Sequence, residues 1–304
     1  MAALTRRSFL QLAASGAAAL HLPLQAEEAH ILLPVNVCGW WGFINRNAQM
    51  EIPAMYQAVF AFASDLAAVK LDQQWGFINR RGTVVIRPQF DEARNFHSGI
   101  SPVRAGTEWG FIRPDGQYAF PARFELARSF QNDRARVLLR GKWGYIDPQG
   151  KMTIEAKYDG ANGYNNDLAP VKLGAKWGYI DKQGKTAIPF VYPAASSFYD
   201  GRAAVQIGER WGFITPKGST SIAPSWDKAG EFSEGLCPVK KDGTWGLIDS
   251  SGAVVLSPTY DEMDNFADGF LAVKRRDVPL YIDHRFRTLW QQNQACQAEK
   301  TRID

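Results

Sequence analysis

The chain has 304 residues, of which 45% are hydrophobic and 12% aromatic, which is enough apolar material for a large buried core. The formal net charge is +4 and falls to +2 without Arg6 and Arg7, since 33 Lys and Arg residues then face 31 Asp and Glu residues. A balance so close to neutral argues against a nucleic-acid-binding surface, which needs basic residues gathered on one face.

The first 26 residues have the features of an export signal. The segment TRRSFLQ, residues 5–11, is followed by an Ala-rich apolar run that ends at Leu24, and Ala26 offers a small residue for cleavage. It resembles the twin-arginine signal, which implies a bacterial protein exported in the folded state to the periplasm or beyond. The run is too short to span a membrane, and no Cys for a lipid anchor follows. We expect a signal peptide over residues 1–26, a linker over 27–30, and no stable membrane insertion afterwards; the alternative is an ordinary N-terminal helix.

From residue 31 onward the sequence repeats with a period of 34 residues, which predicts a tandem-repeat architecture. Five columns keep this register. A Trp-Gly pair begins at Trp41, Trp75, Trp109, Trp143, Trp177, Trp211 and Trp245, and we expect these indoles to form the repeating core. Ile44 and Val35 each begin a further column, and two aromatic columns begin at Tyr56 and Phe62.

With this register the sequence resembles the WG-repeat family, whose unit is similar to WGYID followed by a turn, a strand, and a YD…F…GLA.VK segment. The resemblance covers residues 31–283: seven full repeats and a degenerate eighth, in which Pro279 and Leu280 replace Trp-Gly. We expect a polar tail over residues 284–304, although Trp290 keeps the register of a core residue. The family is better known as a repeat class than as an activity, so the resemblance implies an architecture and no chemistry.

Each unit is predicted to form a small antiparallel sheet. In residues 167–200, LAPVK and WGYID form a hairpin, and the turn at residues 181–184 has the Asp and Gly of a type I turn before a third strand. A short fourth strand is expected in the remainder. Alternation makes both faces of WGYID apolar, so each sheet must be covered by its neighbours, with Gly178 leaving space for an aromatic side chain of the next unit.

Prolines in the LAPVK strand predict how the units are arranged. Pro34, Pro102, Pro170 and Pro238 lack the N–H that a second ladder would need, which makes this strand a free edge and each repeat a separate sheet. We therefore predict an all-β, propeller-like toroid of seven or eight small blades with the LAPVK strand innermost. An open β-solenoid of the same units is the alternative.

Few residues are arranged for catalysis. His30, His97 and His284 occupy unrelated repeat positions, and no phosphate-binding loop, zinc-binding or nucleophile motif is present. Asp residues fill two columns, beginning at Asp147 and at Asp91, but a residue wanted in every unit serves a turn better than a reaction. We expect no enzyme activity, cofactor or metal. The odd number of cysteines, Cys38, Cys237 and Cys296, leaves at least one outside any intrachain disulfide.

Function is expected where single units depart from the repeat. Aromatic, amide and guanidinium groups suit a glycan or peptide surface, and the candidate ligand contacts are Trp40, Tyr164, Asn165, Arg128, Arg134 and Arg136. Three hypotheses follow. The first is an exported, non-catalytic scaffold that binds a protein or a cell-envelope polysaccharide. The second is a hydrolase-type enzyme with single-copy residues at a central mouth. The third is a structural component of a surface assembly.

Overall fold

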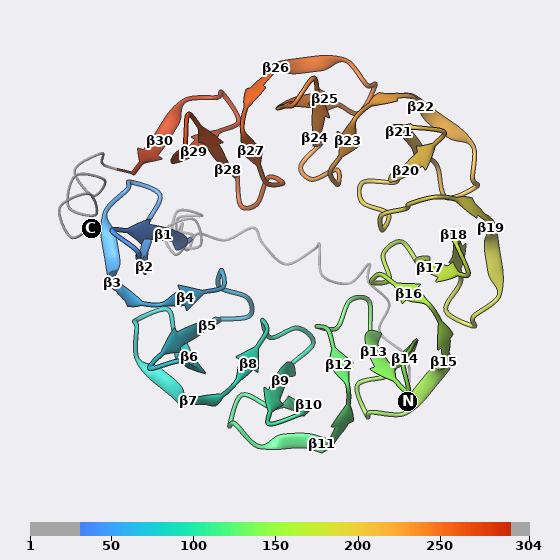
Figure 1. Ribbon diagram of the computed structural model, residues 1–304. Coiled ribbons are helices and arrows are strands. Elements are labelled where there is room, and N and C mark those ends of the chain that lie inside the picture. The colour runs from blue at the N-terminus through green and yellow to red at the C-terminus, as the bar shows by residue number, and fades with distance from the viewer. Residues whose placement is uncertain (1–30, 293–304) are drawn as a thin grey trace, which may run out of the picture. The chain divides into compact units, whose positions relative to one another are not determined.

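The computed structural model describes residues 31–292, which form thirty short strands and no helix (Figure 1). The expected signal peptide and linker, His30 and Cys296 lie outside the described residues. Consecutive strands pair antiparallel into eight small sheets, the blades, and the blades follow one another around a ring. The predicted all-β toroid is therefore confirmed, with eight blades, and the open solenoid is not formed.

The blades contain the following strands. Blade 1 has β1 (Leu33–Val37), β2 (Trp40–Ile44) and β3 (Met50–Tyr56); blade 2 has β4 (Ala58–Val59), β5 (Leu66–Leu71), β6 (Gln74–Asn79) and β7 (Val84–Phe90); blade 3 has β8 (Glu92–Ala93), β9 (Ser101–Ala105), β10 (Glu108–Ile112) and β11 (Tyr118–Phe124); blade 4 has β12 (Leu126–Ala127), β13 (Ala135–Leu139), β14 (Lys142–Ile146) and β15 (Met152–Tyr158). Blade 5 has β16 (Gly160–Ala161), β17 (Ala169–Leu173), β18 (Lys176–Ile180) and β19 (Thr186–Tyr192); blade 6 has β20 (Ala203–Ile207), β21 (Arg210–Ile214) and β22 (Thr220–Trp226); blade 7 has β23 (Lys228–Ala229), β24 (Leu236–Lys241), β25 (Thr244–Asp249) and β26 (Val254–Tyr260); blade 8 has β27 (Glu262–Met263), β28 (Phe270–Arg275), β29 (Val278–Asp283) and β30 (Thr288–Gln291).

Both faces of each Trp-Gly strand are buried between blades. In β6, Phe77 packs against Phe96 and Val103 of the following blade, whereas Ile78 packs with Phe43 of the preceding blade. The ring centroids of Phe77 and Phe96 are 4.9 Å apart in an edge-on arrangement. The hydrophobic core is thus a series of clusters between neighbouring blades, and no blade could bury its apolar faces alone.

The repeated indoles lie at the margin of these clusters. Trp109 is 1% exposed, and the other six of the Trp-Gly column are half-buried. The expected role of the glycine is wrong: a Cβ on Gly178 would lie 2.7 Å from the Ile188 O and 2.9 Å from the Phe190 N, both in β19 of the same blade. The outer strand bulges at this point, since the pairing register shifts between Trp177↔Tyr192 and Tyr179↔Ile188. Glycine therefore makes room for the backbone of its own blade.

The expectation that the LAPVK strand is a free, innermost edge is also wrong in six blades. There a two-residue strand pairs with it from the central side, while the long outer strands such as β7 and β11 follow the periphery (Figure 1). Pro102 is compatible with this pairing because its carbonyl accepts a hydrogen bond from the Arg94 N–H at 3.0 Å. The N–H that Pro102 lacks is not needed for this hydrogen bond. Blades 1 and 6 have three strands within the described residues, and in blade 6 an isolated bridge between Ala195 and Val205 takes the place of the short strand.

The repeated aspartates serve turns, as predicted. Asp181 Oδ1 accepts hydrogen bonds from the backbone N–H groups of Gln183 and Lys185, at 3.0 and 2.9 Å. Asp159, of the other column, accepts the Gly174 N–H at 2.7 Å and so fixes the hairpin turn that precedes the Trp-Gly strand. These carboxylates are used by the scaffold.

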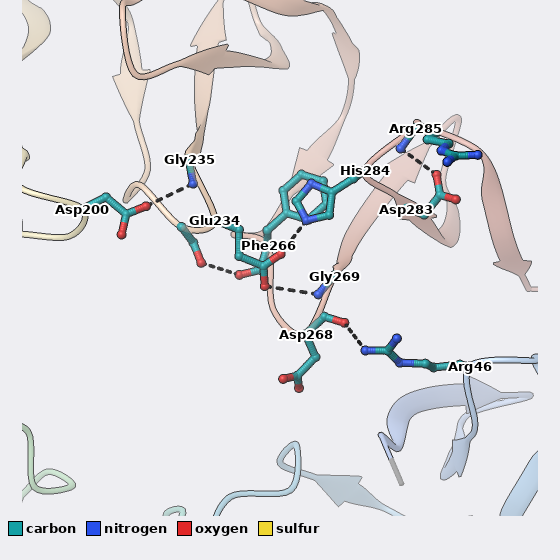
Figure 2. Close-up of polar contacts among 11 residues, drawn as sticks. Arg46, Asp200, Glu234, Gly235, Phe266, Asp268, Gly269, Asp283, His284 and Arg285 are labelled. Carbon is teal, nitrogen blue, oxygen red and sulfur yellow. Dashed lines mark hydrogen bonds and ion pairs between the residues drawn. The ribbon is translucent and has the colours of Figure 1, made fainter. Parts of the chain in front are cut away.

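The ring closes through contacts between blade 8 and blade 1. Tyr281 Oη donates a hydrogen bond to the Pro34 O at 2.8 Å. Arg46 donates to the Asp268 O at 3.4 Å (Figure 2), and its guanidinium lies 5.5 Å from the centre of the Phe270 ring. Leu33, Val35 and Ile44 are buried in this seam.

Neighbouring blades are also joined through their inner loops. Asp200 accepts the Gly235 N–H and Glu234 accepts the Gly269 N–H, each at 3.1 Å (Figure 2). His284 Nε2 lies 2.6 Å from Glu234 Oε2, and its ring stacks on Phe266. These contacts link blades 6, 7 and 8 in sequence.

The last blade extends further than the sequence indicated. β30 pairs with β29 although it lies in the segment expected to be a tail, so the repeat domain continues past residue 283. Trp290 packs against the seam cluster, in agreement with its position in the register. Cys38 is disulfide-bonded, and Cys237 is free and buried.

Candidate functional site

The loops that follow the short inner strands reach toward the centre of the ring (Figure 1). Two positions of each loop vary in chemical character from blade to blade. At the first are Phe60, Arg94, Arg128, Asn162, Ser196, Gly230 and Asp264, and at the second are Ala61, Asn95, Ser129, Gly163, Ser197, Glu231 and Asn265. Since the scaffold does not impose one residue type at these positions, they are free to carry recognition.

Inner loops of blades 4 to 7 meet in one polar cluster. Gln131 Nε2 donates to the Tyr199 hydroxyl at 3.4 Å, although these residues are two repeats apart. The side chains of Asn165 and Glu231 lie near the Tyr199 hydroxyl and influence its pKa. Gly163 has no side chain where Gln131 crosses it, since a Cβ there would overlap the Gln131 Oε1 at 1.3 Å. The cluster is thus assembled from four consecutive units.

A cavity of about 220 Å³ opens beside this cluster. Arg94, Arg128 and Arg136 line it together with Ser129, Gln131 and Gly163. Arg136 belongs to β13, the strand next to the short inner strand β12, at the position that other units fill with Pro or Ala. It donates to Asn162 Oδ1 at 3.1 Å, and the Asn162 carbonyl accepts the Tyr145 hydroxyl at 2.8 Å. Arg136 is therefore held in place by neutral partners.

The charges of the site perturb one another. Burial and the nearby Arg94 lower the pKa of Arg128, and burial, with a contribution from Arg128, lowers the pKa of Arg136. Burial raises the pKa of Glu231 to about 7, although Arg136 and the Tyr199 hydroxyl favour its charged form. The site combines closely placed guanidinium groups with a carboxyl group that changes charge near neutral pH.

Several polar atoms of the site have no partner within the described residues. They are Arg128 Nη1, Arg94 Nε and Asn95 Oδ1, all buried. Ser129 connects them, since its hydroxyl donates to the Asn95 O at 3.0 Å while its side chain lines the cavity. Buried polar groups are normally satisfied, so unpaired ones at a cavity indicate a place where a ligand or solvent supplies the missing bonds.

Among the candidate residues predicted from the sequence, the structure places Arg128 and Arg136 at the cavity and Asn165 near Tyr199 in the polar cluster beside it. Arg134 lies on the same inner loop, where it donates to the Asp133 O at 2.9 Å. Tyr164 is fully buried, 4.8 Å from the Tyr145 ring, and its hydroxyl donates to the Asp181 O, which gives it a packing role. Trp40 is 48% exposed in blade 1 and belongs to none of these contacts.

Sequence reasoning missed Arg94, Gln131, Tyr199 and Glu231. A signal for Glu231 was present, because it is the one charged residue in a column that otherwise holds Ala, Asn, Ser and Gly. The sequence contains no such signal for Tyr199 or Gln131, because the repeat position that they share holds residues of many chemical types. Only the curvature of the ring brings them together.

Metal and membrane sites find no support in the described residues. No group of three or more His, Cys, Asp and Glu side chains is placed to hold a metal ion between residues 31 and 292. In the same part of the chain, no helix is long and apolar enough for a membrane span.

Comparison with known families agrees with the repeat. Seven consecutive segments match the family model described as WG containing repeat, at residues 41–75, 75–106, 109–143, 143–177, 177–211, 211–245 and 245–277. The chain belongs to the WG containing repeat family. In this WG-repeat propeller the matched segments run from one Trp-Gly strand to the next, so each segment joins the outer part of one blade to the inner part of the following blade.

Solved structures similar to this WG-repeat protein share the propeller fold. Dihydro-heme d1 dehydrogenase NirN in complex with DHE has a TM-score of 0.60 at 12% identity, over 87% of this chain and 73% of that chain. A eukaryotic initiation factor gives 0.52 at 9% identity, over 87% and 85%. Hsv2 of Kluyveromyces lactis gives 0.50 at 9% identity, over 75% and 94%. Such identities show a likeness of fold alone. No curated protein sequence matches significantly.

Proposed function

We propose that this WG-repeat propeller is an exported, non-catalytic scaffold that binds a protein or a polysaccharide of the cell envelope through the centre of its ring. The supporting observation is the separation of roles between repeated and single-copy residues. Repeated side chains pack between blades or fix turns, as Phe77 and Asp181 do. Single-copy polar residues of blades 3 to 5 instead line one cavity, and a polar contact joins Gln131 of this cavity to Tyr199 of blade 6. Recognition by a few polar groups on a rigid apolar scaffold is typical of binding propellers.

A binding measurement tests this proposal. The chain without residues 1–26 is immobilised and exposed to peptidoglycan fragments and to envelope extracts. We expect retention of a partner by the wild type and weaker retention by the double variant Gln131→Ala, Tyr199→Ala, because it removes the contact that joins two inner loops. Val191→Ser, on the exposed outer strand β19, is the control and should bind like the wild type. Absence of retention across the panel would remove the support for a binding role.

Export is part of the same proposal and is tested separately. Replacing Arg6 and Arg7 with Lys should leave the protein in the cytoplasm, because the twin-arginine pair that the N-terminal sequence resembles would be lost. Fractionation of cells that produce each form measures this. An unchanged periplasmic fraction would contradict the proposed route.

The enzyme hypothesis has one specific observation in its favour, the raised pKa of Glu231 beside the Tyr199 hydroxyl. A carboxyl group with a pKa of about 7 suits general acid–base chemistry. Glycoside hydrolysis, however, uses two carboxyl groups on either side of the scissile bond, and the described residues lining the cavity include no carboxylate. Binding therefore accounts for more of the site than catalysis does. A third role, in a surface assembly, would appear as self-association in size-exclusion chromatography.

A further inference from the structure

The arginine cavity carries positive charge that the protein itself does not neutralise. Within residues 31–292, neither Arg128 nor Arg136 has a carboxylate within 4.0 Å, and Arg94 has only Glu92, at 3.7 Å. The hydrogen bond of Arg136 goes to a neutral amide. Glu231 acts on Arg136 electrostatically without forming an ion pair. Three guanidinium groups around one cavity thus leave an excess of positive charge.

This arrangement costs stability in the absence of a partner. Buried charges are normally paired, and like charges at close range repel. Arg94 and Arg128 oppose each other's charge, as do Arg128 and Arg136. The repeat does not need these residues, because other units place Pro or Ala where Arg136 lies and uncharged residues at several positions equivalent to Arg128. A role outside folding explains why the charges are concentrated in blades 3 and 4.

The donors are of the kind that hold oxyanions. A guanidinium group presents a planar fork of N–H donors that matches a carboxylate or a phosphate, and charge-assisted bonds of this type are about twice as strong as neutral ones. Arg128 Nη1 and Arg94 Nε are buried without acceptors. An anion in the cavity would supply acceptors for both and balance the charge.

The volume limits what can enter. The cavity, at about 220 Å³, is below the range of roughly 300–1,000 Å³ that is common for whole small-molecule sites. It fits a charged end group or a single sugar acid and not a length of peptide. The buried Asn95 Oδ1, next to Ser129, remains as an acceptor for a hydroxyl or amide hydrogen beside the anion.

We infer that the cavity between Arg94, Arg128 and Arg136 binds an oxyanion group, a carboxylate or a phosphate, of the ligand held at the centre of the ring. This inference rests on the proposed binding role and specifies its chemistry. The carboxylate of an acidic sugar and a phosphate group share this chemistry, and the experiment separates them.

Calorimetric titration of the chain without residues 1–26 tests the site with three probes: D-galacturonate, inorganic phosphate, and neutral D-galactose at constant ionic strength. We expect binding of at least one anion and none of galactose. Arg128→Gln and Arg136→Gln should each weaken the anion roughly tenfold or more, because one charge-assisted contact is lost. Arg81→Gln, an exposed turn arginine of blade 2, makes the same change of charge elsewhere and should bind like the wild type.

Thermal melting shows whether the two arginine variants are still folded, so that a loss of anion binding is not mistaken for unfolding. Arg128→Gln and Arg136→Gln should melt no lower than the wild type without anion, because each removes a like charge, and should lose the stabilisation that the anion gives the wild type. Equal anion affinity in wild type and both variants, or no anion binding by the wild type, would overturn the inference.

The envelope measurement separates this inference from the broader proposal. If the wild type retains an envelope partner and Arg128→Gln and Arg136→Gln retain it equally, the binding role stands and the oxyanion site is wrong. If anions bind in the cavity but no envelope component is retained, the site stands and the proposed function falls.

Discussion

Single residues in this protein are best understood by whether they repeat. Asp181 and Glu231 are both acidic, but Asp181 accepts two backbone N–H groups of an exposed turn, and Glu231 lies among the inner loops with a raised pKa. The first is present in several copies because each hairpin needs it. The second appears once, where burial disfavours its charge. Position in the repeat therefore distinguishes turn-forming carboxylates from the buried single-copy one better than residue type does.

Glu231 makes stability depend on pH. Its pKa is about 7 in the folded protein, above the ordinary value of 4.5, so between these limits the folded chain keeps a proton that the unfolded chain has lost. The contribution of the protonated Glu231 to the free energy of unfolding is therefore complete below pH 4.5 and is lost as the pH rises through 7. We expect Glu231→Gln to match the wild type at pH 5 and to exceed its free energy of unfolding at pH 8 on the order of 1–3 kcal/mol.

Urea denaturation of both proteins at the two pH values measures the difference. Glu209→Gln, which replaces an exposed glutamate of a hairpin turn, is the control and should follow the wild-type profile. A Glu231→Gln profile parallel to that of the wild type would show that Glu231 titrates normally.

At the scale of the strand, the Trp-Gly sequence fits a sheet that is covered on both faces and bulged along one edge. Phe77 and Ile78 face opposite neighbours, and the register shift between Trp75 and Phe77 brings the outer strand over Gly76. The short inner strand completes the blade by donating to the carbonyl of Pro102 or of its equivalents. The close approach of the outer strand thus explains the glycine of a pair such as Trp75-Gly76, and a proline such as Pro102 is compatible with pairing on both sides of its strand.

Gly178→Ala tests the role of the glycine. The new Cβ would lie within 3.0 Å of backbone atoms of Ile188 and Phe190, so either the bulge or the strand must shift. We expect a loss of about 1–3 kcal/mol in the free energy of unfolding, as for other overpacked sites. Lys176→Ala, at an exposed position of the same strand, should change it little. Equal free energies of unfolding for Gly178→Ala and Lys176→Ala would contradict the close approach of the outer strand to Gly178.

The whole molecule is stabilised as a ring, because the first blade covers the last. Ile44 of β2 is 1% exposed in the seam between blades 8 and 1, and Ile214 of β21, in the same column, is 0% exposed between blades 5 and 6. In an open array the face carrying Ile44 would be left to solvent. Because the ring is closed, Ile44 in the first blade is buried as fully as Ile214 in an internal blade.

Matched substitutions measure this equivalence. Ile44→Ala and Ile214→Ala should each lower the free energy of unfolding by about 2–5 kcal/mol, the usual cost of such a cavity in a core. Guanidinium denaturation of the two variants gives the comparison. A cost for Ile44→Ala well below that for Ile214→Ala would mean that the seam opens in solution.

The sequence by itself determined the local structure and the class of fold. The period of 34 residues, the Asp-Gly turns and the two-faced apolar strands predicted separate small sheets in tandem, because these features depend on interactions within one unit or with the next. Several of the residues at the centre, Arg128 and Arg136 among them, were recognisable as departures from the repeat.

Only the tertiary structure decided the number of blades, the closure of the ring and the make-up of the site. The sequence left seven and eight blades open, and it assigned β30 to a tail because that strand lacks the repeated residues. The contact of Gln131 with Tyr199, and the electrostatic effect of Arg136 on Glu231, depend on the angle between successive blades. Small differences in packing set this angle, and its effect accumulates around the ring. No pattern along the chain contains that angle, so contacts between units two or three repeats apart could not be predicted from it.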